Sequence, residues 1–398
     1  MSRSAITGTI LSITAALLAS CGGTAGGTPN SANTTPAATP SASGGVFEGT
    51  FRTQAFGTYN EPWAAEFAPG TQTLFITEKG GTVRGFDTRN NRQITVTGAP
   101  RVDYGGQGGL GDIAFLPSQS AATVGTRTIY LSWAEAGDND TRGAVVGRGQ
   151  LVCDTDTACR IDNLAVIWRQ APKVTGRGHY SHRIAFSPDE RFMFIGSGDR
   201  QKMEPAQDLS GTLGKIVRLN LDGTVPAGNP FADRGGASAQ IWSYGHRNIL
   251  GLQFDAEGRL WNMEHGPAGG DELNLVQAGG NYGWPRASNG EHYDGTPIPD
   301  HAPGDGFIPF VVNWTPVIAP GNFIFYRGDL FRGWRGDALF SGLKSEALVR
   351  VDVNGTSARE AARFPMGERL REVVEAPDGA LWVLEDGEGG RLLRLTPG

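Results

Sequence analysis

Residues 183–196 read RIAFSPDERFMFIG: a short apolar strand, a Pro-Asp turn and a second apolar strand. Apolar runs of this length, bounded by Pro, Asp and Gly, are typical of β-strands joined by turns. The same unit, with a third apolar strand after a loop, recurs from about residue 50 to the end of the chain. Its six copies begin near Trp63, Asp112, Arg183, Leu252, Phe323 and Glu372.

The spacing of the copies is uneven, roughly 50 to 70 residues, which is longer than compact propeller repeats but of the same kind. Antiparallel sheets repeated radially form a propeller, which protects its strand edges by closing on itself. We therefore expect an all-β fold, a six-bladed β-propeller with antiparallel four-stranded blades around a central channel. A pair of β-sandwiches is the alternative, but it would not explain the repeated turn.

The composition agrees with this fold class. The 398 residues include 59 Gly and 23 Pro, and only 19% are charged. Such a mixture favours short strands joined by turns over long amphipathic helices. The formal net charge is -6 and there is no run of Lys or Arg, so we expect no nucleic-acid partner.

The N-terminus has the features of an export signal. Residues 5–18 form a modestly apolar run that is too short to span a bilayer. The run ends in Leu18-Ala19-Ser20-Cys21, which resembles the lipobox of bacterial lipoproteins, where the Cys is lipidated. We predict lipid attachment at Cys21 and a periplasmic or cell-envelope location, with the protein held at a membrane surface only by this anchor. An ordinary secretory signal cut nearby is the alternative.

These features divide the chain into three parts. Residues 1–21 are interpreted as a lipoprotein-type signal peptide that ends at the lipobox Cys. Residues 22–45 are rich in Gly, Ser, Thr and Pro without an apolar period, as in a flexible linker. Residues 46–398 are expected to form the propeller domain.

The two remaining cysteines, Cys153 and Cys159, bracket a polar Asp/Thr loop. In an exported protein this spacing predicts a disulfide that closes a small loop. A metal site is the weaker interpretation, because no His or third Cys lies near them in the sequence.

The repeat also predicts where a functional site lies. In an antiparallel blade, the start of the first strand and the end of the second lie at the same end of the sheet. Several polar or turn residues precede first strands or follow second strands, and the radial repeat should gather them at one mouth of the channel. They are Gln107, His179, Arg247, Asn248, Gly266, Pro267, Lys344, Arg369 and Arg371.

These residue types favour an anionic ligand. Several cations at one mouth of an acidic protein suit a ligand with more than one carboxylate, while Gln107 and Asn248 supply neutral donors. His179 is the candidate proton acceptor, because a His with a pKa near neutrality can take a proton from a substrate hydroxyl. We expect His182 to be structural. Trp314, in Asn-Trp-Thr-Pro, is the candidate for stacking on a sugar or another flat ligand.

The Gly266-Pro267 turn is a candidate calcium site. Pro lacks an N–H and Gly lets the backbone turn tightly, so neighbouring carbonyl oxygens can point at one spot. Carbonyl oxygens with acids nearby, here Asp271 and Glu272, suit a hard cation such as Ca²⁺. We expect the two acids to anchor the loop. A plain turn is the alternative.

Five motifs carry a family resemblance: Gly105–Gly111 (GGQGGLG), Ala206–Leu209 (AQDL) followed by Gly214–Leu219 (GKIVRL), Trp242–Asn248 (WSYGHRN), Glu264–Asn274 (EHGPAGGDELN) and Asn281–Pro285 (NYGWP). With these motifs in order, the chain over about residues 50–397 resembles the soluble sugar dehydrogenases that depend on pyrroloquinoline quinone (PQQ). Within them it is most similar to the bacterial aldose sugar dehydrogenases.

The resemblance implies a six-bladed propeller that binds PQQ through Ca²⁺ and oxidises an aldose sugar. It implies that His179 takes the anomeric proton while hydride passes from the sugar C1 to PQQ C5, and that an external acceptor (a quinone, cytochrome or dye) removes the electrons. The remaining implied roles are calcium ligation for the Gly266 and Pro267 carbonyls, charge stabilisation for Arg247 with Asn248 and Gln107, and binding of cofactor carboxylates for Lys344, Arg369 and Arg371.

One position departs from part of the family. The glucose-oxidising members carry Asp before the catalytic His, whereas this chain has Gly178, as in the aldose enzymes of broader specificity. Two other functions are weighed: a non-catalytic carbohydrate- or protein-binding propeller, and a calcium-dependent lactonase-like hydrolase. A non-catalytic relative could lose His179 or Arg247, and this chain keeps both. A calcium-dependent hydrolase would need acidic and amide side chains as metal ligands around the channel. The residues expected at this mouth are instead mostly cationic.

Overall fold

The computed structural model describes residues 46–398, and nearly all of their regular structure is β-strand. The all-β class predicted from the turns and apolar runs is therefore confirmed. The described residues also contain four short 3-10 helices, namely η1 (Pro117–Gln119), η2 (Glu204–Ala206), η3 (Ala232–Arg234) and η4 (Ser238–Gln240).

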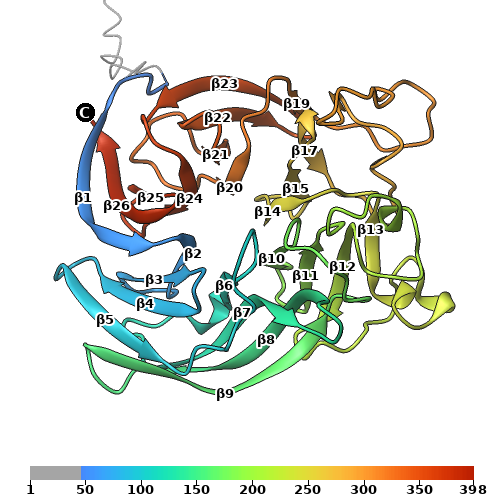
Figure 1. Cartoon of the computed structure of the whole chain (residues 1–398). Helices are drawn as coiled ribbons and strands as arrows, with labels where there is room; N and C mark the ends of the chain where they lie inside the picture. Colours follow the sequence, from blue (N-terminus) through green and yellow to red (C-terminus); the bar gives the residue numbers. More distant parts are fainter. Residues whose placement is uncertain (1–45) are drawn as a thin grey trace, which may run out of the picture. The chain divides into compact units, whose positions relative to one another are not determined.

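Each predicted copy begins with a strand that lies beside a common axis (Figure 1). These inner strands contact one another in sequence order, and the last contacts the first again. Most of their residues are buried, which is why they read as continuous apolar runs rather than alternating ones. The inner strands are β2 (Pro62–Phe67), β6 (Leu110–Phe115), β10 (Ser181–Phe186), β14 (Ile249–Phe254), β20 (Pro320–Phe325) and β24 (Leu370–Glu375).

From each inner strand the chain runs outward through antiparallel neighbours. The second strands are β3 (Thr73–Glu78), β7 (Thr126–Ala136), β11 (Phe192–Ser197), β15 (Leu260–Glu264), β21 (Ala338–Gly342) and β25 (Leu381–Glu385). The third strands are β4 (Thr82–Asp87), β8 (Arg142–Val152), β12 (Lys215–Asn220), β17 (Asp271–Leu275), β22 (Ala347–Asn354) and β26 (Glu388–Pro397). The outermost strands are β5 (Arg92–Thr97), β9 (Ala158–Arg169), β13 (Ile241–Tyr244), β19 (Val312–Trp314), β23 (Ser357–Pro365) and β1 (Phe51–Asn60).

The sheets differ in one respect from the predicted separate blades. Four sheets have four strands each, but the strands of the first two copies form one eight-stranded sheet, in the order β2-β3-β4-β5-β9-β8-β7-β6. The two halves join where β5 and β9 pair in parallel over Thr95–Thr97 and Ala158–Arg160. A separate two-stranded ribbon, β16 (Ala268–Gly269) with β18 (Gly290–Glu291), lies beside the Gly266-Pro267 turn.

The two ends of the described chain meet in one sheet. β1 pairs antiparallel with β26, from Phe51 opposite Pro397 to Asn60 opposite Glu388, and Figure 1 shows the two strands side by side. The first strand is therefore the outer edge of the last sheet. A closed ring of sheets needs such a pairing, because otherwise only turns would hold its ends together.

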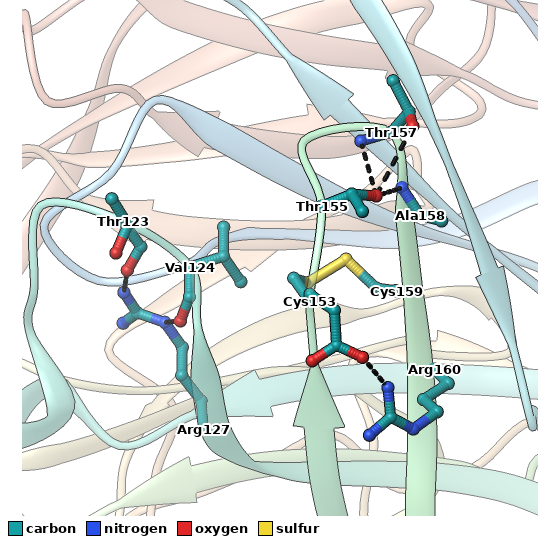
Figure 2. The surroundings of a disulfide bond; sticks show 10 residues. Thr123, Val124, Arg127, Cys153, Thr155, Thr157, Ala158, Cys159 and Arg160 are labelled. Atoms are coloured by element: carbon teal, nitrogen blue, oxygen red, sulfur yellow. Dashed lines mark hydrogen bonds and ion pairs between the residues drawn. A yellow bond between two sulfur atoms is a disulfide. The ribbon is translucent and has the colours of Figure 1, made fainter.

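The predicted disulfide is present between Cys153 and Cys159 (Figure 2). It closes the hairpin between β8 and β9, beside the parallel pairing with β5. Arg160, next to it, forms an ion pair with Asp154. The buried Arg127 donates to five carbonyl oxygens of the neighbouring loops, including that of Val124 (2.8 Å). The disulfide and this arginine therefore tie together the loops at one corner of the eight-stranded sheet.

The predicted lipobox Cys21 and the linker over residues 22–45 lie outside the described residues. Among residues 46–398 no helix is both long and apolar enough to span a bilayer.

Candidate active site

Most of the predicted site residues, but not Trp314, come together at the end of the inner strands where β6, β10 and β14 begin, which we call the polar mouth. Gln107, His179 and Arg247 precede these three strands. A cavity of about 220 Å³ at this end is lined by Gln107, Asn248, His265, Leu343, Arg369 and Arg371, among others. His265 also lines a small adjoining cavity with Arg247, Gly266 and Trp284. The rule that starts of first strands and ends of second strands share one end of a blade thus predicts the location.

His179 is held between two partners. Its backbone N–H donates to Gln107 Oε1 (2.7 Å), and its ring Nδ1 lies 2.7 Å from Asp199 Oδ1. Asp199 is fully buried and also accepts from Trp284 Nε1 (2.8 Å) and from the Gln201 backbone N–H (2.8 Å). An ionised carboxylate only accepts hydrogen bonds, so Nδ1 must carry the proton and Nε2 keeps a free lone pair. His179 is therefore prepared to act as a base through Nε2.

The burial of His179 favours the same neutral state. Burial lowers the pKa of His179 below its ordinary 6.5, the positive Arg247 adds to this effect, and the hydrogen bond to Asp199 opposes it. Burial alone would raise the pKa of Asp199, but the hydrogen bonds from His179 and Trp284 hold it below its usual value. At neutral pH the pair is thus a neutral imidazole and a carboxylate, the protonation state that a general base requires.

The backbone at this pair is strained. His179 has φ +47° and Arg200 has φ +58°, values that residues with a Cβ rarely adopt. The Arg200 N–H donates to the His179 carbonyl (3.3 Å), and Gly198 lies so close that a Cβ on it would be 2.1 Å from the same oxygen. The buried Arg200 guanidinium also donates to the Gly178 carbonyl (2.9 Å). Strain of this kind persists only where surrounding contacts enforce it, and it is concentrated at functional sites.

Arg247 is buried, with its guanidinium facing the mouth. Glu264 accepts from its backbone N–H (2.6 Å), while Nη1 donates to the His265 carbonyl (3.2 Å) and Nη2 to the Tyr293 hydroxyl (3.2 Å). Its Nε is buried and has no hydrogen-bond partner within residues 46–398. The Trp284 ring centroid lies 5.2 Å from the guanidinium carbon. A buried cation with an unused donor is suited to an anionic or strongly polarised oxygen.

Of the two acids predicted to anchor the Gly266-Pro267 turn, Asp271 does so, whereas Glu272 accepts from Asn274 Nδ2 (3.2 Å). Asp271 Oδ1 accepts from the Gly266 N–H (2.9 Å), and its Oδ2 accepts from the Ala319 N–H (2.7 Å). Burial raises the pKa of Asp271 to about 7, although these amides oppose the rise. A Cβ on Gly266 would lie 2.1 Å from the Gly269 oxygen, so only Gly fits. Residues 46–398 contain no group of three or more His, Cys, Asp or Glu side chains arranged for a metal ion, so a cation here would need backbone carbonyls.

Arg369 and Arg371 share a partner that was not predicted from the sequence. Arg369 (2.9 Å) and Arg371 (2.8 Å) both pair with Asp386, which directly follows β25. One carboxylate therefore neutralises part of the charge of two guanidinium groups. Lys344 follows β21 and is exposed, and its backbone N–H donates to the Ile318 carbonyl (2.9 Å).

Trp314 does not match the predicted stacking role. It is only 5% exposed, packs against Phe340 in the hydrophobic core, and donates from Nε1 to Glu360 (2.7 Å). Its position in β19 turns it away from solvent, which spacing alone does not reveal. His182 is buried as expected: it stacks on Trp63 and bonds Ser132 (2.7 Å), and burial lowers its pKa to about 3.

Some functional neighbours of the predicted residues were not predicted from the sequence. Asp199 and Asp386 both follow second strands, so the strand-end rule could have found them. Trp284, which was given no functional role from the sequence, bonds Asp199 and lies beside Arg247. Tyr293 lies on a loop outside the repeat, and no sequence signal marks it.

Comparison with known proteins agrees with this geometry. The family model described as glucose/sorbosone dehydrogenase matches residues 59–394. Aldose sugar dehydrogenase YliI of Escherichia coli is 36% identical over 344 residues, which cover 85% of this chain and 90% of that protein. The crystal structure of the soluble aldose sugar dehydrogenase from E. coli in its apo form superposes with a TM-score of 0.81 at 35% identity, covering 88% of this chain and all of that one.

A second solved structure extends the comparison. The PQQ-bound aldose sugar dehydrogenase from Streptomyces coelicolor superposes with a TM-score of 0.70 at 27% identity, covering 88% of this chain and 98% of that chain. The family match spans the strands that build the polar mouth. This chain belongs to the glucose/sorbosone dehydrogenase family.

Proposed function

We propose that this protein is an aldose dehydrogenase that uses PQQ and Ca²⁺ and oxidises the sugar at C1 to an aldonolactone. The observation that carries the proposal is the His179–Asp199 pair beside the buried Arg247 guanidinium. A neutral base next to a cation suits removal of a hydroxyl proton while negative charge develops on a neighbouring oxygen. The named relatives are sugar dehydrogenases, and one structural neighbour is described as PQQ-bound.

The residues at the polar mouth fit such a cofactor. Arg247 offers a buried Nε that has no hydrogen-bond partner among the described residues 46–398, and Arg369 and Arg371 line the same cavity as Asn248. Guanidinium groups and amides match the carboxylates and quinone oxygens of PQQ. For Ca²⁺, the fit rests on the tight, anchored Gly266-Pro267 turn, whose carbonyl oxygens are hard donors.

The chemistry divides between the cofactor and the chain. When bound, PQQ polarised by Ca²⁺ would accept the C1 hydrogen as hydride, and an external acceptor would later remove the two electrons from the reduced cofactor. His179 Nε2 takes the proton of the anomeric hydroxyl, which leaves a lactone carbonyl at C1. Asp199 holds the tautomer and stabilises the imidazolium that forms, while Gln107 positions the His179 backbone.

We also propose that the fold is a six-bladed propeller, with the eight-stranded sheet counted as two blades. The ring of inner-strand contacts and the outward strand order support this count. The polar mouth would then be one end of the central channel.

The test of the proposed function uses the purified protein with added PQQ, Ca²⁺, an artificial electron-accepting dye and a panel of aldoses. We expect dye reduction that requires the sugar and both additions, and that stops when a chelator removes the metal. Absence of sugar-dependent dye reduction across the whole panel would refute the proposal.

Export and anchoring form a separate proposal. Because Cys21 directly follows Leu-Ala-Ser, we propose that it is lipidated and holds the enzyme at a membrane of the cell envelope. Cys21→Ala should move the protein from the membrane to the soluble fraction on cell fractionation. Retention in the membrane fraction would reject attachment through this residue.

A further inference from the structure

Tyr293 is the most exposed large hydrophobic side chain described, at 76%. A single exposed apolar residue is ordinary on a protein surface, so the exposure alone carries no function. Its surroundings distinguish this one. The Tyr293 hydroxyl accepts a hydrogen bond from Arg247 Nη2 (3.2 Å), and its ring centroid lies 5.8 Å from the Arg247 guanidinium carbon. An open aromatic face is therefore attached to the polar mouth.

The loop that carries Tyr293 is anchored at the Gly266-Pro267 turn. Ala268 and Gly269 of β16 pair with Glu291 and Gly290 of β18, and Tyr293 follows two residues later. The turn over 292–296 is closed by its own hydrogen bonds, from the His292 N–H to the Thr296 carbonyl (2.9 Å) and from the Thr296 N–H to Asp294 (2.9 Å). The position of the ring is thus set by a short structured turn.

Tyr293 is linked to His179 through three residues, Arg247, Trp284 and Asp199. Arg247, which Tyr293 contacts, lies 5.2 Å from the Trp284 ring, and Trp284 donates to the same Asp199 carboxylate that holds His179. The charge of Arg247 also contributes to the lowered pKa of His179. The exposed ring of Tyr293 therefore lies near the position of a ligand whose reacting hydroxyl faces His179.

We infer that Tyr293 is the aromatic platform on which the pyranose ring of the aldose packs, and that it is a specificity-determining residue. This inference rests on the proposed function. The C–H face of a pyranose is apolar and matches an aromatic face, while its hydroxyls bond to polar groups around it. A ring held by a short structured turn loses little freedom when a sugar binds. Trp314 cannot serve, because the core buries it.

The experiment compares wild type, Tyr293→Ala, Tyr293→Phe and the control Val225→Ala. Val225 is also exposed, at 41%, and lies in the loop after β12, outside the polar mouth. For Tyr293→Ala we expect the KM for the aldose to rise about tenfold, as for one lost stacking contact, with kcat within about twofold. Tyr293→Phe keeps the ring, so its KM should stay within about twofold of wild type, as should that of Val225→Ala.

Two binding measurements complete the test. The aldonolactone product, which does not react further with the oxidised cofactor, should bind the PQQ-loaded Tyr293→Ala about tenfold more weakly in calorimetry. The affinity of the apo variants for PQQ should be unchanged.

The outcomes separate the two proposals. An unchanged KM in Tyr293→Ala, an equal loss in Tyr293→Phe, or a matching fall in PQQ affinity would each overturn the inference while wild type stays active. A wild type without sugar-dependent turnover would instead overturn the proposed function and, with it, this role.

Discussion

Replacing Asp199 by Asn tests whether this carboxylate sets the tautomer of His179. Asp199 Oδ1 accepts from His179 Nδ1 (2.7 Å) and the Gln201 N–H (2.8 Å), and Oδ2 accepts from Trp284 Nε1 (2.8 Å) and the Met203 N–H (3.3 Å). An Asn side chain has one oxygen and one NH₂, so the NH₂ must face one of these pairs. The indole and the amides can only donate, whereas an imidazole nitrogen can accept. The NH₂ therefore turns toward His179.

This rotation removes the base. With the Asn NH₂ donating to Nδ1, the imidazole proton moves to Nε2, and no lone pair faces the sugar. General base catalysis contributes about a hundred- to ten-thousandfold to rate, so we expect kcat to fall by that range. This equals about 2.7 to 5.5 kcal/mol of activation free energy. The Gln201 amide also loses its acceptor, at a cost of about 1–3 kcal/mol in unfolding free energy.

The assay is kcat at saturating aldose with PQQ, Ca²⁺ and dye, together with thermal unfolding and PQQ titration. The matched control is Asp189→Asn, which changes an exposed carboxylate that accepts from Ser187 in the turn between β10 and β11. The control should keep wild-type kcat. If Asp199→Asn is folded, binds PQQ and keeps kcat within about threefold of wild type, the carboxylate does not set the reactive tautomer.

Further expectations concern the base, the turn and the disulfide. His179→Ala should bind PQQ but lose about a hundred- to ten-thousandfold in kcat; a wild-type kcat would remove His179 from the mechanism. Because burial lowers the pKa of His179 below 6.5, kcat/KM of the wild type should fall only as pH drops through that lowered value, and an acid limb above 6.5 in the pH–rate profile would contradict this. Gly266→Ala places a Cβ 2.1 Å from the Gly269 oxygen, which costs about 1–3 kcal/mol of overpacking. PQQ and Ca²⁺ titrations should therefore show at least about tenfold weaker binding. Unchanged binding would show that the turn does not hold the metal. Replacing Cys153 and Cys159 by Ser removes a disulfide that joins residues six positions apart. The free energy of unfolding in denaturant should fall by about 2 kcal/mol with kcat unchanged. A large loss of kcat would mean that this part of the eight-stranded sheet affects the active site.

Much of this protein is encoded in local patterns. The Pro/Asp turns and apolar runs determine the all-β class, because strand length and turn chemistry are local properties. The strand-end rule places Gln107, His179 and Arg247 at one mouth, since antiparallel pairing dictates which strand ends meet. The short spacing of Cys153 and Cys159 in an exported protein predicts their disulfide.

Other features arise only when distant segments meet. The pairings of β1 with β26 and of β5 with β9 join segments whose sequences do not predict which strand each one pairs with. The hydrogen bond between His179 and Asp199 joins residues 20 positions apart in the sequence. The sharing of Asp386 between Arg369 and Arg371 depends on the register of β24 and β25. The contrast between the buried Trp314 and the exposed Tyr293 is also tertiary, because the two aromatics look alike until packing decides which one faces solvent. Local patterns specify which strands form, whereas long-range packing decides which side chains meet. The energy of each such contact depends on residues that are distant in the sequence and become neighbours only in the folded chain.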